Sequence, residues 1–411
     1  MAYPVGPNRA AGLPAGTMRG MVALRILFLL VGAIIGVFYP FIPAILDDRG
    51  FSAAEVGLTT AAASLAFIVS VAGWGHLGDA VLGRAAALRI GVVGSTIAVV
   101  GLLADVPPLG VALLIVVFVI FESSFSPLSD ALAVNALAGS PRAYARVRLL
   151  ASLGFAVVSI GAGRLYDAVG YGPTAILWAA GAVGMLVTIQ AVPDVRRYHD
   201  APTGRPHRGG TFGVALRREP RLWGVLLGLA LVHVGIISGF TFLSLRLLDL
   251  GAGASGVALS AGISALAEIP AMAMIPRLAG RVGIRAVLVG GIVLYAVVMT
   301  SWAFLADPTL IVVSRLASGV AFAGISIGAV VTISVLLPPE LQATGQALYQ
   351  IVGFGIAAVA ANAIGGVVYG SAGPLPLFLG SAVLAAFGAV VAHRSIPSTV
   401  AAARMAARQE G

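Results

Sequence analysis

The segment Gly75-His-Leu-Gly-Asp79, followed by Gly83-Arg84, lies between two long apolar runs of the sequence. Three varied copies of this pattern occur further along: Gly163-x3-Asp167 before Gly170, Pro276-x3-Gly280 before Gly283, and Gly366-x3-Gly370 before Gly373. Glycine permits tight turns and the close approach of helices. Each copy therefore predicts a tight turn after a helix, and four copies indicate one structural unit used four times.

Twelve apolar runs surround these turns. Of the 411 residues, 59% are hydrophobic and only 10% are charged, whereas soluble proteins carry about 25% charged residues. A helix needs about 20 apolar residues to cross a bilayer. The predicted spans are residues 21–46, 53–77, 86–104, 108–136, 146–166, 171–192, 221–248, 255–278, 285–305, 309–336, 343–369 and 374–394.

An arginine-rich polar stretch separates six spans from the other six. We predict an N-terminal six-helix bundle at 1–192, a cytoplasmic linker at 193–220 and a C-terminal six-helix bundle at 221–411. The halves repeat at a spacing of about 201 residues and keep one in-out direction, while the four glycine patterns alternate between membrane faces. The predicted fold is an all-α membrane protein with twelve transmembrane helices in two pseudo-symmetric halves.

The basic residues other than histidine are all arginine, and they set the expected orientation. With the N-terminus in the cytoplasm, chiefly Arg49 and Arg164 remain outside, as the positive-inside rule requires. We therefore expect a multi-pass protein of the inner membrane with both termini cytoplasmic. The net charge of +9 comes from arginines that set the membrane orientation, and it does not indicate nucleic-acid binding. The first apolar run is too long for a signal peptide.

No enzyme chemistry is expected. Cysteine is absent, which excludes disulfides and thiol nucleophiles. The sequence contains no Walker A motif and no histidine or carboxylate cluster with metal-ligand spacing. We therefore expect neither a cofactor nor a metal.

The loop from Gly75 to Arg84 resembles the signature of the major facilitator superfamily, with one extra residue before Gly83. The chain is most similar to the branch of oligosaccharide/proton symporters, nucleoside/proton symporters and phenylpropionate-type permeases. Three stretches carry this resemblance: 36–57 with Gly36-Val-Phe-Tyr-Pro-Phe-Ile-Pro, 127–155 with Pro127-Leu-Ser-Asp130 and Tyr144-Ala-Arg146, and Gly163-Arg-Leu-Tyr-Asp167. The resemblance implies the major facilitator fold and solute transport.

The resemblance also implies a sugar-type site. Those symporters hold the sugar between a span-4 carboxylate and a span-5 arginine eighteen residues later, and Asp130 and Arg148 have that spacing. Ser152 and Phe155 occupy the places of the family's small residue and stacking aromatic. The alternative is a structural ion pair between Asp130 and Arg148.

Two carboxylates lie near the middle of predicted spans and are candidate proton carriers. Glu122 lies in span 4, and Glu268 lies in span 8 just before Pro270. Ionisable groups at this depth are costly unless they face a cavity or a partner. A polar packing seam is the alternative for Glu122, and an interhelical hydrogen bond is the alternative for Glu268. The histidine and carboxylate that the symporters carry on span 10 are replaced here by Ser318 and Ala321.

The remaining candidates are weaker. His233 is either a substrate ligand or a packed histidine, and Arg315 is expected to pair with Glu268 or to attract an anion. Asp79 with Arg84 or Arg89 predicts a cytoplasmic gate. Because span 4 carries acids where span 10 does not, we expect the substrate chemistry to rely mainly on the N-terminal half.

These features together predict a secondary transporter that works by alternating access. We expect proton-coupled uptake of a small organic solute such as a sugar, nucleoside or aromatic acid, by a monomer whose partners are substrate, protons and the bilayer. One alternative is a proton-coupled exporter of hydrophobic compounds. A second alternative is a non-transporting receptor or scaffold, which predicts no cavity between the halves.

Overall fold

The computed structural model describes residues 15–137, 141–192 and 212–396. All elements in this part of the chain are helical. The elements are α1 Ala15–Phe38, η1 Tyr39–Phe41, α2 Ile42–Asp48, α3 Ala53–His76, η2 Leu77–Val81, α4 Arg84–Gly101, α5 Pro108–Glu122, α6 Phe125–Ala136, α7 Pro141–Val169, α8 Thr174–Ala191, α9 Phe212–Arg218, α10 Arg221–Asp249, α11 Gly253–Val282, α12 Ile284–Phe304, α13 Pro308–Leu336, α14 Pro339–Tyr349, η3 Gln350–Ile356, α15 Ala357–Ala372 and α16 Pro374–Ser395.

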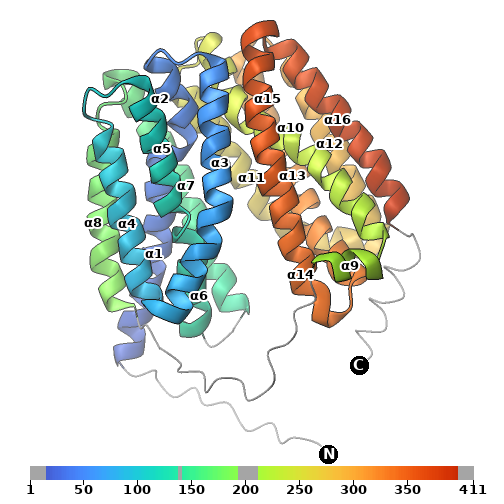
Figure 1. The fold of residues 1–411 in the computed structure, drawn as a ribbon, viewed down its shortest axis with the longest axis horizontal. Helices are drawn as coiled ribbons and strands as arrows, with labels where there is room; N and C mark the ends of the chain where they lie inside the picture. Colours follow the sequence, from blue (N-terminus) through green and yellow to red (C-terminus); the bar gives the residue numbers. More distant parts are fainter. Residues whose placement is uncertain (1–14, 138–140, 193–211, 397–411) are drawn as a thin grey trace, which may run out of the picture.

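Twelve membrane spans are confirmed within the described residues, each long and apolar enough to cross a bilayer. They form two bundles, α1–α8 and α10–α16, which lie side by side in Figure 1. Most of the predicted linker, residues 193–211, lies outside the described part. Its last portion forms the short helix α9, which the sequence reading did not anticipate.

Several spans are interrupted where the sequence weakens the helix. In the first span, Pro40 and Pro43 remove backbone donors, and the 3₁₀ segment η1 separates α1 from α2. In the fourth span, the hydroxyls of Ser123 and Ser124 bond back to the carbonyls of residues 120 and 121 at 2.8 and 2.7 Å. Such local bonds compete with the helix ladder, and α5 ends there.

The glycine patterns form the predicted tight turns. The last glycines of the four copies, Gly83, Gly170, Gly283 and Gly373, have φ of 85°, 73°, 84° and 81°. An L-residue pays a steric cost at such angles. Gly83, Gly283 and Gly373 each precede the first turn of the next helix, so the glycine reverses the chain at the membrane surface.

Each half has its own aromatic core. The fully buried Trp178 contacts Phe38 and Phe118 edge-on in the N-terminal half, with ring centroids 6.0 and 5.0 Å apart. The fully buried Trp302 contacts Tyr295 and Phe378 in the C-terminal half. Edge-to-face pairs add about 0.5–1.5 kcal/mol beyond area burial, so these rings stabilise the packing within each bundle.

Glycines bring the helices of the N-terminal half into backbone contact. A Cβ placed on Gly36 of α1 would lie 2.7 Å from the carbonyl oxygen of Phe155 on α7. A Cβ on Gly154 of α7 would lie 2.2 Å from the carbonyl oxygen of Leu29. Small residues are what allows such close packing in membranes, and this packing fixes the backbone position of Phe155.

The contacts between the halves differ at the two ends of the spans. We call the end where α8 finishes and α10 begins the linker face, and the opposite end the far face. At the far face, Gly366 of α15 packs on Gly57 of α3, and Gly163 of α7 packs on Ala258 of α11. At the linker face, a Cβ on Gly75 or Gly280 would meet nothing within 4 Å. Figure 1 shows the bundles approaching each other at the end away from α9 and α14.

Candidate functional site

A cavity of about 420 Å³ lies between the two halves at the middle of the spans. Its wall combines aromatic side chains with polar ones from both bundles. The aromatic lining residues are Tyr39, Phe67, Phe155, Phe240, Tyr295, Phe322 and Phe354, and the other polar or charged ones are Thr60, Ser64, Thr241, Ser264, Glu268, Arg315 and Asn362. Such a wall suits a ligand that presents both an apolar surface and hydrogen-bonding groups.

The charged part of the wall comes from the C-terminal half. Arg315 is only 6% exposed, donates from Nε to the Ser260 carbonyl oxygen at 3.2 Å, and lies 5.4 Å from the centroid of the Trp302 ring. Glu268 and Arg315 interact electrostatically, but no direct ion pair joins these two described side chains. The predicted pairing is therefore a charge interaction across the cavity wall. Tyr295 lies near both groups.

Glu268 lies on α11, which stays helical through both Pro270 and Pro276. Its neighbours on the wall are Ala265 and Ser264, and the Ser264 hydroxyl lies 3.4 Å from that of Ser318. The position of Glu268 on the cavity wall matches what a proton or substrate site needs, because the charge then faces a space large enough for water.

Glu122 lies beside the cavity, toward the linker face. It is the last residue of α5 and is 9% exposed. Two residues of the cavity wall, Ile115 and Val119, precede it by seven and three positions, so all three share one helix face. Its charge acts on Tyr39, which also lines the cavity. Within the described ranges its carboxyl group is buried without a hydrogen-bond partner, and its role stays a prediction.

Only one of the four residues of the sugar-type site lines the cavity in this conformation. Phe155 lines the cavity, whereas Asp130, Arg148 and Ser152 are not among its lining residues. Arg148 is exposed, and no ion pair joins it to Asp130 in the described structure. Tyr144 interacts electrostatically with both, and its hydroxyl is also a hydrogen-bonding neighbour of Asp130.

Asp130 keeps one unsatisfied oxygen. Its Oδ2 accepts a long hydrogen bond of 3.5 Å from Ser126, while Oδ1 is buried without a partner among the described residues. A buried carboxylate oxygen that lacks a partner is costly.

His233 is fully buried and does not line the cavity. Its Nδ1 lies 2.7 Å from the Leu229 carbonyl oxygen, and its Nε2 lies 3.4 Å from the Tyr349 hydroxyl. Its ring contacts Tyr349 and Phe354 edge-on. Both ring nitrogens are thus engaged by the protein, which is the geometry of the packed-histidine alternative.

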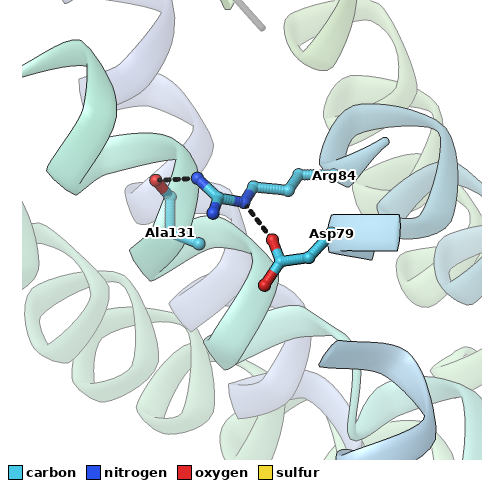
Figure 2. Close-up of polar contacts among 3 residues, drawn as sticks. All are labelled: Asp79, Arg84 and Ala131. Atoms are coloured by element: carbon cyan, nitrogen blue, oxygen red, sulfur yellow. Dashed lines mark hydrogen bonds and ion pairs between the residues drawn. The ribbon is translucent and has the colours of Figure 1, made fainter. Parts of the chain in front are cut away.

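The predicted gate residues lie at the linker face, but all within the N-terminal half. Figure 2 shows Arg84 donating to Asp79 Oδ1 at 2.7 Å from Nε and to the Ala131 carbonyl oxygen at 3.3 Å from Nη1. This arrangement ties η2 to α4 and α6. Arg89 is exposed one turn further along α4. In this conformation the group braces one bundle, and its ion pair and hydrogen bonds to described residues all stay within the N-terminal half.

The charged contact between the halves is at the far face instead. Asp167, at the end of α7, accepts hydrogen bonds from the backbone N–H groups of Ala254 at 2.6 Å and Ser255 at 3.2 Å. These groups belong to the first turn of α11, where unpaired N–H groups and the helix dipole favour an anion. The sequence pattern Gly163-x3-Asp167 was visible, but nothing in it indicated a partner in the other half.

An amide bridges the halves beside the cavity. Asn362 Nδ2 of α15 donates to the Ser64 hydroxyl of α3 at 3.2 Å, and Asn362 Oδ1 accepts from Thr241 of α10 at 2.7 Å. All three residues line the cavity. Asn362 therefore both connects the two bundles and offers polar atoms to the binding site.

The chain belongs to the MFS_1-like family, whose model matches residues 21–380, and it is a transporter of the major facilitator type. It is 26% identical over 249 residues to the maltose permease of Geobacillus stearothermophilus, covering 60% of this chain and 61% of the permease. The chain thus spans about three fifths of the length of that curated relative.

Three solved structures share the fold. A mutant form of the nucleoside transporter NupG has a TM-score of 0.76 at 17% identity, covering 93% of this chain and 100% of that chain. The D-xylose-proton symporter has a TM-score of 0.66 at 14% identity, covering 94% and 99%. A bacterial homologue of the human lysosomal transporter Spinster, inward-facing and unoccupied, has a TM-score of 0.65 at 17% identity, covering 94% and 98%.

Proposed function

We propose that this protein takes up a small organic solute, a sugar, nucleoside or aromatic acid, in symport with protons. The observation that carries the proposal is the central cavity, which combines stacking surfaces with hydrogen-bonding groups and two charged side chains. A receptor or scaffold would need no such cavity. Uptake would proceed by alternating access, as the halves 1–192 and 221–411 rock about the cavity.

The described conformation is proposed to be open toward the cytoplasm. The far-face contacts of Gly163, Gly366 and Asp167 close one end, while the linker-face glycines are free. The linker face carries most of the arginines, which supports our proposal that this face lies on the cytoplasmic side of the inner membrane. We propose a monomer, because the cavity is complete within one chain.

A ring-bearing, polyhydroxylated solute would use the two kinds of wall. Phe155 and Phe67 would stack on a ring, and Asn362 and Arg315 would bond to hydroxyl groups. The names of the relatives, which include maltose, nucleoside and xylose transporters, favour this class. Thermal-shift screening of the purified protein against sugars, nucleosides and aromatic acids would identify the solute. The expected result is stabilisation by one of these three classes and by no other.

Arg315 is proposed to contact the substrate directly. Arg315→Lys keeps the positive charge but loses the planar fork, so the affinity for the identified solute should fall about tenfold or more, the worth of one bidentate bond. Arg148→Lys is the informative companion, because Arg148 lies off the cavity in this conformation. A fall in affinity there would place Asp130 and Arg148 on the substrate in another conformation, and unchanged affinity would remove them from the site.

Glu268 and Glu122 are proposed to carry the coupled proton. Glu268→Gln should abolish flux driven by a pH gradient in proteoliposomes while leaving counterflow exchange, because only the driven cycle must return an empty, proton-exchanging carrier. Glu122→Gln tests the second candidate in the same way. Driven flux that survives in both variants would contradict the proton assignment.

Export of hydrophobic compounds is the second candidate function, and the largely apolar cavity wall favours it. A host growth assay separates the two directions of transport. Export predicts resistance to hydrophobic drugs, and uptake predicts growth on the solute.

A further inference from the structure

A second concave site lies on the outer surface of the C-terminal bundle, between α12 and α16. It has a volume of about 670 Å³, and its wall is apolar along most of its length, with Val293, Val297, Val383 and Val390 among the lining residues. Both helices span the membrane, so the groove opens to the acyl chains of the bilayer. Its residues from Leu379 to Arg394 cover about 22 Å along α16 at 1.5 Å per residue.

The linker-face end of this groove is basic. His393 and Arg394 line it, and both are exposed. Arg285, at the start of α12, donates from Nη2 to His393 Nε2 at 2.7 Å and from Nη1 to the Ile396 carbonyl oxygen at 3.2 Å. A guanidinium can only donate, so His393 Nε2 is the acceptor and its Nδ1–H remains a donor. The end of the groove thus offers two positive charges and an additional hydrogen-bond donor.

The corresponding position of the N-terminal half is neutralised. Arg84 is the counterpart of Arg285 at the 201-residue spacing, and Asp79, which pairs with Arg84, corresponds to Gly280. The C-terminal copy therefore lacks the acid. No acidic residue occurs between Glu268 and Asp307 or between Glu340 and Arg394 in the sequence. The excess positive charge at this end of α12 and α16 has no internal counter-ion along these segments.

We propose that the α12–α16 groove binds an anionic phospholipid of the linker-side leaflet, with its phosphate at Arg285, His393 and Arg394 and one acyl chain along the valine-rich wall. Charge complementarity selects the headgroup, since basic pockets between transmembrane helices at the membrane surface bind anionic lipid headgroups. The location of the apolar wall at bilayer depth selects a lipid over a soluble phosphate. This site is separate from the central cavity and does not depend on the transported solute.

Native mass spectrometry of the purified protein, titrated with dioleoyl phosphatidylglycerol or dioleoyl phosphatidylcholine, tests the site. The wild type should retain one phosphatidylglycerol in preference to phosphatidylcholine. Arg394→Gln should weaken phosphatidylglycerol binding roughly fivefold, and Arg285→Gln with Arg394→Gln should weaken it roughly 25-fold, at about a fivefold loss per positive charge. Arg146→Gln removes an exposed charge from the N-terminal half and should leave binding unchanged.

Two further measurements separate the acyl chain from the phosphate. Ala386→Phe fills the groove from its exposed side and should lower the affinity for dioleoyl phosphatidylglycerol while the basic end stays intact. Glycerol 3-phosphate at millimolar concentration should not displace the lipid. Equal retention of the two lipids, displacement by glycerol 3-phosphate, or full binding by Arg394→Gln would each overturn the proposal. Arg394→Lys keeps the charge and should bind phosphatidylglycerol normally. That result would show that the weaker binding of Arg394→Gln comes from the lost charge and not from misfolding.

Discussion

Gly75 and Gly163 occupy the same position of one repeated pattern, yet they lie in opposite surroundings. A Cβ on Gly163 would lie 2.6 Å from the Cβ of Ala258 in the other half, whereas one on Gly75 would meet nothing within 4 Å. The acids of the two copies differ in the same way. Asp167 binds the first turn of α11 across the interface, and Asp79 binds Arg84 within its own half.

The two faces of the interface between the halves differ in the same way as these two glycines. The far-face copy contacts the other half through Gly163 and Asp167, whereas Gly75 of the linker-face copy faces open space. The interface is therefore closed at the far face and open at the linker face. Asp79 occupies in the linker-face copy the position of Asp167 in the far-face copy, so we expect Asp79 to form a similar contact when the linker face closes. A transport cycle between two such conformations requires that their free energies differ by only a few kcal/mol.

The largest effect should come from Gly366→Leu. The added Cβ would lie 2.7 Å from the Ala53 carbonyl oxygen and 2.8 Å from Gly57 Cα. These are backbone atoms that cannot give way, so the far face should separate. Overpacking of this kind costs about 1–3 kcal/mol, which shifts the conformational equilibrium by roughly 5- to 150-fold.

The absence of cysteine makes the measurement direct. Ala261→Cys places one thiol on the cavity wall, and an impermeant maleimide reports its access from the far side. Labelling should rise in the Gly366→Leu background. Gly75→Leu is the matched control, because its side chain enters open space in this conformation, and labelling from the far side should stay low. Equal labelling in both backgrounds would contradict the difference between the faces.

Asp167→Asn should have an intermediate effect. It keeps the shape and one acceptor oxygen but removes the charge that faces the first turn of α11. A charge at a helix N-terminus contributes about 0.3–1 kcal/mol, so far-side labelling of Ala261→Cys should rise two- to fivefold. Rescue by Asp167→Glu would support the charge effect, and an unchanged rate in Asp167→Asn would show that the glycine contacts alone close the far face.

Asp79→Asn should have the smallest effect on this conformation. The Arg84–Asp79 pair has side chains 25% and 62% exposed, and such exposed pairs contribute about 0–1 kcal/mol. The melting temperature should fall by no more than a few degrees, and far-side labelling should not change. A large rise in labelling would mean that this pair acts on the far face through the N-terminal bundle.

The charges of the cavity wall are divided unequally between the two halves, while the prediction that the substrate chemistry relies mainly on the N-terminal half stays a prediction. The charged residues of the wall, Glu268 and Arg315, both come from the C-terminal half, while Glu122 lies beside the cavity and Asp130 away from it. The prediction counted acids per span. It could not take account of the break at Ser123–Ser124, after which α6 carries Asp130 toward the linker face.

The twelve spans and the four glycine turns follow from the sequence alone. Each depends on a local property, namely the length of an apolar run or the need of a residue with positive φ for glycine. The sequence also singled out Glu268 and Arg315, since ionisable groups at bilayer depth are few, whereas Phe155 was singled out by the family resemblance.

Only the tertiary structure decided which residues meet. The partners Asp167 and Ala254 are 87 positions apart, and Asn362 and Ser64 are 298 positions apart. Whether such a pair is in contact depends on which face of the interface is closed. That depends on how the two halves pack against each other over long sequence separations, which local sequence patterns do not specify.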